Sequence, residues 1–222
     1  LWLKQQWETG EDKLQLMFMG YHNSWNSADQ IPSRAVKSSL ISEFGSIDPS
    51  AGGDSSRYSL SANWQRNLDS GYLQASIYGI DYEMELYSNF SYFTSPQGDQ
   101  FQQIDQRRIY GGSIEWRQDL ALGSVKMSNS YGTQIRIDDI DKVGLRSSAQ
   151  RQVLGAIRLD AVVERSAGLY WQNETHWSDN LRTVFGLRYD YYDFDVAAKE
   201  AADVSTLRPN SGSNMDDIVT PS

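Results

Sequence analysis

The chain has 222 residues, of which 39% are hydrophobic and 22% charged, and its net charge is −9. This acidic balance argues against nucleic acid as a partner, because phosphate contacts need a basic surface. The absence of cysteine excludes a disulfide framework and a thiolate metal site. No apolar run approaches the roughly 18 residues that a membrane-spanning helix needs. A helical membrane protein is therefore excluded, whereas a β-barrel, whose inner face and loops are polar, is not.

Alternation of apolar and polar residues predicts about eight β-strands. They cover residues 1–8, 13–25, 57–67, 72–93, 107–117, 124–137, 166–177 and 181–195. The last one alternates most clearly, with Phe185, Leu187 and Tyr189 on one face and Gly186 and Arg188 on the other. Strands of this length exceed the usual length of about 5–6 residues and match the roughly 9–11 residues that cross an outer membrane.

One predicted strand, residues 72–93, changes its pattern part-way. Ala75 and Ile77 have one parity, whereas Tyr78 and Ile80 have the other. We predict a β-bulge near Gly79 that exchanges the two faces of this strand.

The connections between the predicted strands alternate strictly between short and long. The short ones, residues 9–12, 68–71, 118–123 and 177–180, are rich in Gly, Asp, Asn and Ser, as tight turns require. The long ones cover residues 26–56, 94–106, 138–165 and 196–222, and we expect a short helix within 32–41. Short periplasmic turns and long extracellular loops are typical of outer-membrane barrels. The sequence thus predicts an all-β fold, an antiparallel up-and-down transmembrane β-barrel segment of about eight strands.

The aromatic residues fall into two groups along the predicted strands. Trp64, Trp116 and Trp177 lie close to short turns, whereas Phe90 and Tyr189 lie near long connections. Two belts of amphipathic rings are typical of a membrane interface. The alternative, that aromatic residues simply favour strands, stays open.

Several stretches share the strand and loop texture of one known family. They are Ser24-Trp25-Asn26, Asp29-Gln30-Ile31-Pro32, Arg57-Tyr58-Ser59-Leu60-Ser61, Trp64-Gln65-Arg66, Gly98-Asp99-Gln100-Phe101, Gly168-Leu169-Tyr170 and Leu181-Arg182-Thr183-Val184. These stretches, spread over nearly the whole chain, resemble TonB-dependent outer-membrane receptors, the plugged barrels that import iron chelates and other scarce nutrients. The resemblance implies a closed barrel of about 22 strands. Residues 1–222 would form a partial β-barrel domain, about a third of that wall.

The resemblance also implies a function and a set of partners. We expect a receptor of the bacterial outer membrane that imports a scarce small molecule, with an iron–siderophore chelate as the first expectation. Outer-membrane lipid would surround the barrel, and a TonB-type energy-coupling protein would contact an N-terminal region that these residues do not include. Neither a plug domain nor a coupling box is found among these residues, so we interpret the chain as a fragment. No cofactor is expected.

Candidate ligand-binding residues lie in the predicted loops and near the top of the lumen. They are Gln30, Arg34, Asp99, Gln103, Arg107 and Arg108. Arginine suits an anionic chelate because its planar fork binds carboxylates or phosphates bidentately. For each residue the alternative is an ordinary solvated side chain or a strand-end ion pair.

Other chemistry finds little support in the sequence. His22 and His176 lie at opposite ends of the predicted strands, so we expect no shared metal site. Glu83 and Glu85 share one strand face, as in a glycosidase pair, but nothing else indicates a sugar cleft. No phosphate-binding loop or nucleophile motif is present, and we expect no enzyme. Two alternatives stay open: a passive outer-membrane channel or barrel adhesin, and a soluble β-sandwich that binds carbohydrate.

Overall fold

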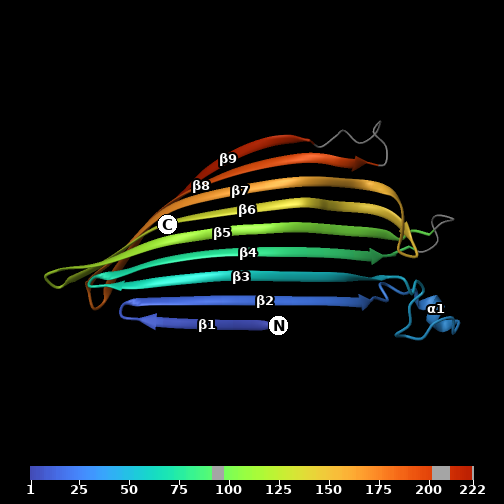
Figure 1. Ribbon diagram of the computed structural model, residues 1–222, viewed down its shortest axis with the longest axis horizontal. Helices are drawn as coiled ribbons and strands as arrows, with labels where there is room; N and C mark the ends of the chain where they lie inside the picture. Colours follow the sequence, from blue (N-terminus) through green and yellow to red (C-terminus); the bar gives the residue numbers. More distant parts are fainter. Residues whose placement is uncertain (92–97, 202–210, 222) are drawn as a thin grey trace.

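The fold is one antiparallel sheet of nine strands that follow each other in sequence order (Figure 1). The computed structural model describes residues 1–91, 98–201 and 211–221. The strands are β1 (Trp2–Thr9), β2 (Asp12–Asn26), β3 (Gly52–Leu68), β4 (Gly71–Ser88), β5 (Phe101–Leu122), β6 (Val125–Ala149), β7 (Gln152–Ser178), β8 (Leu181–Ala201) and β9 (Gly212–Pro221). The predicted all-β, up-and-down antiparallel architecture is confirmed, with nine strands where about eight were expected.

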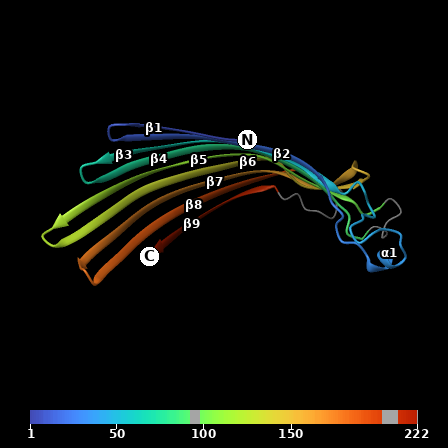
Figure 2. The same ribbon diagram turned by 90° about the horizontal axis from the view of Figure 1, so that it is seen from below.

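The sheet is a single curved layer, as the edge-on view in Figure 2 shows. Four short turns lie at one end of the strands. The opposite end carries the long connection between β2 and β3, which includes the short helix α1 (Ser33–Lys37). Because the described residues form one sheet with no second sheet packed on it, the β-sandwich alternative is wrong. Within the same residues no helix is long and apolar enough to span a membrane.

One face of the sheet, here called the apolar face, carries large hydrophobic side chains that no other part of the described chain covers. Ile77 is 66% exposed and lies between Ala62 and Gly112 of the neighbouring strands. The same face includes Leu60, Ile114, Ile135, Leu169 and Leu187, all more than half exposed. An apolar surface of this extent is not stable in water, so it needs lipid or another apolar partner.

Most strands run farther than the alternation predicted, whereas β4 ends at Ser88, before the predicted limit at residue 93. Residues 138–165, expected as a loop, continue β6 and β7 and turn at Gln150 and Arg151, both with positive φ (51° and 64°). Part of 196–222 forms the end of β8 and all of β9, and β3 and β5 begin inside the expected loops 26–56 and 94–106. Residues 94–97 and 202–210 lie outside the described residues. Beyond the apolar band a strand needs only its backbone hydrogen bonds, so alternation no longer marks it.

The predicted bulge near Gly79 is wrong. β4 pairs in unbroken register with both β3 and β5. Tyr78 instead lies on the other face and covers Gly111, where an added Cβ would come within 2.4 Å of the Tyr78 hydroxyl oxygen. The pairing of β5 with β6 does contain a register shift, where Asp141 is the extra residue between the partners of Gln106 and Arg107. The sequence pattern of β4 therefore changes parity because Tyr78 lies over Gly111 on the polar face, and no bulge is involved.

Candidate functional site

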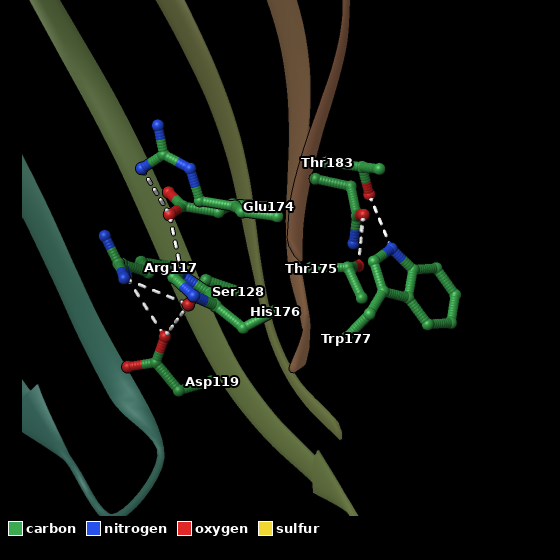
Figure 3. A network of polar contacts seen from close by, with 10 residues as sticks. Arg117, Asp119, Ser128, Glu174, Thr175, His176, Trp177 and Thr183 are labelled. Atoms are coloured by element: carbon green, nitrogen blue, oxygen red, sulfur yellow. Dashed lines mark hydrogen bonds and ion pairs between the residues drawn. The ribbon is translucent and has the colours of Figure 1, made fainter. Parts of the chain in front are cut away.

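The face opposite the apolar face carries polar and charged side chains along every strand and is called the polar face here. Figure 3 shows how the strand geometry separates the two faces at the short-turn end of β7. Glu174 and His176 lie together on the polar face. Thr175 and Trp177 lie on the other side of the strand, where Trp177 Nε1 donates to Thr183 Oγ1 at 2.9 Å. Successive side chains alternate in this way because a strand repeats every two residues.

At the short-turn end of the polar face, Arg117 and Arg182 each lie close to a carboxylate. Arg117 Nε donates to Asp119 Oδ1 at 3.1 Å. Glu174 Oε1 lies 2.8 Å from His176 Nε2 and accepts from Arg182 Nη1 at 3.1 Å (Figure 3). This end therefore presents a network of paired charges.

In the middle of the polar face a second network joins four strands. The hydroxyls of Tyr72 and Tyr170 donate to the two oxygens of Glu115, at 2.6 and 2.5 Å. The Arg188 guanidinium lies over the Tyr170 ring, 5.9 Å from its centroid, and donates to Asp190. A hollow of about 330 Å³ lies beside this network. Its polar lining includes Ser76, Ser113, Gln134, Arg136, Ser166, Arg188 and Asp190.

Nearer the long-loop end, four residues form a row across β2 to β5. The register places Tyr21 opposite Arg57, Arg57 opposite Tyr82 and Tyr82 opposite Arg107. Arg107 donates to both oxygens of Asp105, at 2.7 and 2.6 Å. Arg57 has no such partner among the described residues, and its Nε is buried there without a hydrogen-bond acceptor. Arg57 was expected in a strand and was not among the predicted site residues.

Arg57 is exceptional among the arginines of the described strands. Every other one lies within 4 Å of a carboxylate. The pairs are Arg66–Asp12, Arg107–Asp105, Arg108–Asp81, Arg117–Asp119, Arg136–Asp138, Arg146–Glu200, Arg158–Asp160, Arg165–Asp193, Arg182–Glu174 and Arg188–Asp190. Among the arginines of the described strands, Arg57 is thus the one without a carboxylate partner.

The long-loop end is held together by Gln100, whose side chain is buried and uses its full hydrogen-bonding capacity. Its Nε2 donates to Asp48 Oδ2 at 3.0 Å and to Ser50 Oγ at 2.7 Å. Its Oε1 accepts from Ser148 Oγ at 3.0 Å and from the Arg151 backbone N–H at 2.9 Å. Gln100 therefore connects the loop between β2 and β3 to the β6–β7 hairpin.

Asp48 is the charged member of this loop anchor. Partial burial opposes its ionisation, but hydrogen bonds from Ser50, Asn89 and Gln100 outweigh burial and lower the pKa of the carboxyl below its usual value. The Asn89 side chain donates to Asp48 Oδ2 at 2.9 Å. The anchor is thus built around an ionised carboxylate.

The six predicted site residues occupy different surroundings. Gln30 and Arg34 are exposed, the latter within α1, and Gln103 is exposed on β5. Asp99 accepts a hydrogen bond from Ser91 Oγ at 2.9 Å. All four belong to the long-loop end, as expected.

Arg107 and Arg108 do not act from the same side. They are consecutive in β5, so Arg107 lies on the polar face and Arg108 on the side of the apolar face. Arg108 Nε lies 3.5 Å from Asp81 Oδ2. A hollow of about 300 Å³ next to it is also lined by Asp81, Glu83, Asp139 and Asp141. Anions are disfavoured there because the carboxylates outnumber the cations.

The histidines lie apart, as predicted. His22 is 3.5 Å from Asp54 at the long-loop end, whereas His176 pairs with Glu174 at the short-turn end. Across the described part of the chain, no group of three or more His, Cys, Asp or Glu side chains is arranged to hold a metal ion.

Comparison with known families identifies the barrel. The family model described as TonB dependent receptor-like, beta-barrel, matches residues 5–222. The chain belongs to this family. Its members are transport receptors of the outer membrane rather than enzymes. No curated protein matches the chain.

Solved structures agree with this fold. The ferric citrate transporter FecA, in its unliganded form, aligns with a TM-score of 0.78 and 10% identity over 99% of this chain. The ferric-catecholate import receptor Fiu from E. coli K12 aligns in its open form with a TM-score of 0.62, 8% identity and 94% coverage. Its closed form gives 0.58, 11% and 95%. The chain spans 32%, 41% and 38% of those three chains. At these identities the likeness shows the fold alone.

Proposed function

We propose that this chain is part of the barrel wall of an outer-membrane TonB-dependent transporter that imports an iron–siderophore chelate. In addition to the family membership, one structural observation supports this proposal. Nine strands of 8 to 27 residues have an exposed apolar face and a polar opposite face. A sheet of this kind is stable with lipid on one side and water on the other. The polar face would then line the lumen.

The rest of the wall would come from outside residues 1–222, which we propose form a partial β-barrel domain of a larger receptor. In the described sheet, β1 and β9 each pair on one side only. An open edge exposes unpaired backbone groups, and closing a barrel with further strands removes it. The long-loop end would face the outside, and a TonB-type protein would act through another part of the receptor.

The ligand is inferred from the neighbours and from the surface at the long-loop end. Two of the similar folds are a ferric citrate transporter and a ferric-catecholate import receptor. We propose that Gln30, Arg34, Asp99, Gln103 and Arg107 supply contacts near the mouth. Arg107 is the best placed because it lies on the polar face. Arg108, which was expected to join it, would instead face the outer surface.

The charge arrangement favours capture near the top of the wall. Farther down, Arg136 is paired with Asp138 and Arg188 with Asp190. Paired charges attract an anion much less than a free cation does. Along the described strands, a chelate released from the top would therefore pass arginines that are already paired with carboxylates.

The test uses the complete receptor in a strain that lacks it. Uptake of radioactive iron would be measured with ferric citrate and with a ferric catecholate, with and without the TonB-type protein. We expect uptake of at least one chelate, abolished when the coupling protein is removed. Uptake that persists without coupling would favour the passive channel, and no receptor-dependent uptake of either chelate would refute the proposed function.

A further inference from the structure

We propose that Tyr21, Arg57 and Tyr82 form an oxyanion-binding site on the polar face, and that it selects chelates with a free carboxylate. The inference rests on the proposed function, which it deepens by naming the class of chelate. Its basis is the single arginine of the described strands that has no carboxylate partner and whose Nε is buried without an acceptor.

The strand register explains why Arg57 has no partner. Its eight nearest positions on the polar face all carry neutral side chains: Met19, Tyr21 and Asn23 on β2, Ser55 and Ser59 on β3, and Ile80, Tyr82 and Met84 on β4. The nearby acids Asp54, Asp81, Glu83 and Glu85 have the opposite parity and point to the other face. The positive charge of Arg57 is therefore not neutralised on its own side of the sheet.

The unpaired guanidinium has a reason to take up an anion. A shielded N–H without an acceptor destabilises the protein by roughly 1–3 kcal/mol, which a bound oxygen atom would remove. Guanidinium matches a carboxylate with two parallel hydrogen bonds. An anion can bind Arg57 without breaking an ion pair. At Arg107 the anion would first have to displace Asp105.

The two tyrosines complete the site. Tyr21 and Tyr82 lie directly opposite Arg57 on its two neighbouring strands, about 5 Å away at the backbone. The Tyr21 hydroxyl is 3.3 Å from Ser55 Oγ and can still donate to a ligand. Arg107 lies two strands from Arg57, roughly 10 Å away, on the far side of Tyr82. A small planar anion between two phenols fits this row better than a bulky neutral ligand.

The experiment measures binding to the complete receptor in detergent by calorimetry. The probes are ferric citrate, metal-free citrate and a neutral trihydroxamate ferric chelate. The variants are Arg57→Gln, Arg57→Lys and Tyr82→Phe. Arg66→Gln is the matched control, because Arg66 lies on the same strand but is paired with Asp12 at the other end. Thermal unfolding of each variant is recorded alongside.

We expect Arg57→Gln to weaken ferric citrate binding roughly tenfold to a hundredfold, as for loss of a charged hydrogen bond. Arg57→Lys should recover part of the affinity, and Arg66→Gln and the neutral chelate should be unaffected. Unchanged citrate affinity in Arg57→Gln would overturn the site. A fall in thermal stability without a fall in affinity would also overturn it, because Arg57 would then pair with a carboxylate of another part of the receptor. If Arg57→Gln does not fold, unaltered affinity in Arg57→Lys and Tyr82→Phe would overturn it.

The same data separate this site from the proposed function. A wild-type receptor that binds no ferric chelate but binds metal-free citrate through Arg57 refutes the import of ferric chelates and keeps the oxyanion site. Binding of ferric citrate that is independent of Arg57 keeps the proposed function and refutes the site.

Discussion

The loop anchor at Gln100 gives the sharpest test of how the long-loop end is organised. Gln100 is only 3% exposed and makes four hydrogen bonds, two donated and two accepted. Gln100→Ala removes all four. It leaves the Ser148 hydroxyl and the Arg151 backbone N–H without their acceptor.

The size of the effect follows from these four bonds. A neutral hydrogen bond contributes about 0.5–1.5 kcal/mol net, and an unsatisfied buried donor adds to the loss. Water can rehydrate Asp48 and Ser50, which are only partly buried, so we expect a total of about 2–4 kcal/mol. The loss should affect the opening of residues 27–51 and not the whole barrel, because the strands below keep their pairing.

Hydrogen exchange measured by mass spectrometry on the complete receptor tests this expectation. Peptides from 27–51 should exchange roughly thirtyfold to a thousandfold faster in Gln100→Ala. Gln103→Ala is the control, since Gln103 lies three residues away in β5 and its side chain is exposed. Unchanged exchange in 27–51, or equal effects of both substitutions, would show that Gln100 does not anchor the loop.

Three further predictions address the faces, the wall and the loop. Leu60→Arg on the apolar face should lower the free energy of unfolding by about 2–4 kcal/mol, whereas Ser61→Arg on the polar face should change it by less than about 1 kcal/mol. Chemical unfolding in lipid vesicles measures both values, and equal effects of the two substitutions would contradict the assigned faces. Gly132→Val should lower the free energy of unfolding by about 1–3 kcal/mol, because a Cβ there would lie 2.2 Å from the Tyr170 ring; an unchanged melting temperature in detergent would contradict this packing. Because the pKa of Asp48 is lowered in the folded state, its stabilisation is present above about pH 4 and is lost as the pH falls through the folded value. Exchange of 27–51, corrected for intrinsic rates, should therefore rise at low pH, and an identical pH profile in Asp48→Asn would argue against Asp48 as the titrating group.

Strand identity and faces were largely predictable, because period-two alternation reports which side of a strand meets an apolar medium. Leu187 and Tyr189 were assigned to one face from sequence, and the register places both in the apolar rows. The limits of the strands were not predictable. Above the apolar band both faces are wet, so nothing in residues 141–160 distinguishes a paired strand from a loop.

The apparent parity change in β4 shows a second limit. Tyr78 and Ile80 are large and apolar, so the pattern placed them toward lipid. Their true position depends on partners such as Gly111, which leaves room for the Tyr78 ring on the polar face. A single strand does not reveal whether a large residue is buried against lipid or against a glycine across the ladder.

The site illustrates the same limit in its strongest form. Arg107 and Arg108 were both predicted as ligand-binding residues. Because they are consecutive in a strand, they lie on opposite faces, and each is close to a carboxylate. Arg57 was not selected from the sequence, because one strand does not show which side chains of its neighbours lie beside it. Only the register of β2, β3 and β4 shows that the acids of the neighbouring strands point away from it. The chain has a net charge of −9, and Arg57 is still left without a carboxylate partner. The reason is that the acids on its own and neighbouring strands have the parity of the opposite face. Charge composition therefore says little about where an anion binds in such a wall, whereas the cross-strand neighbours of each arginine decide it.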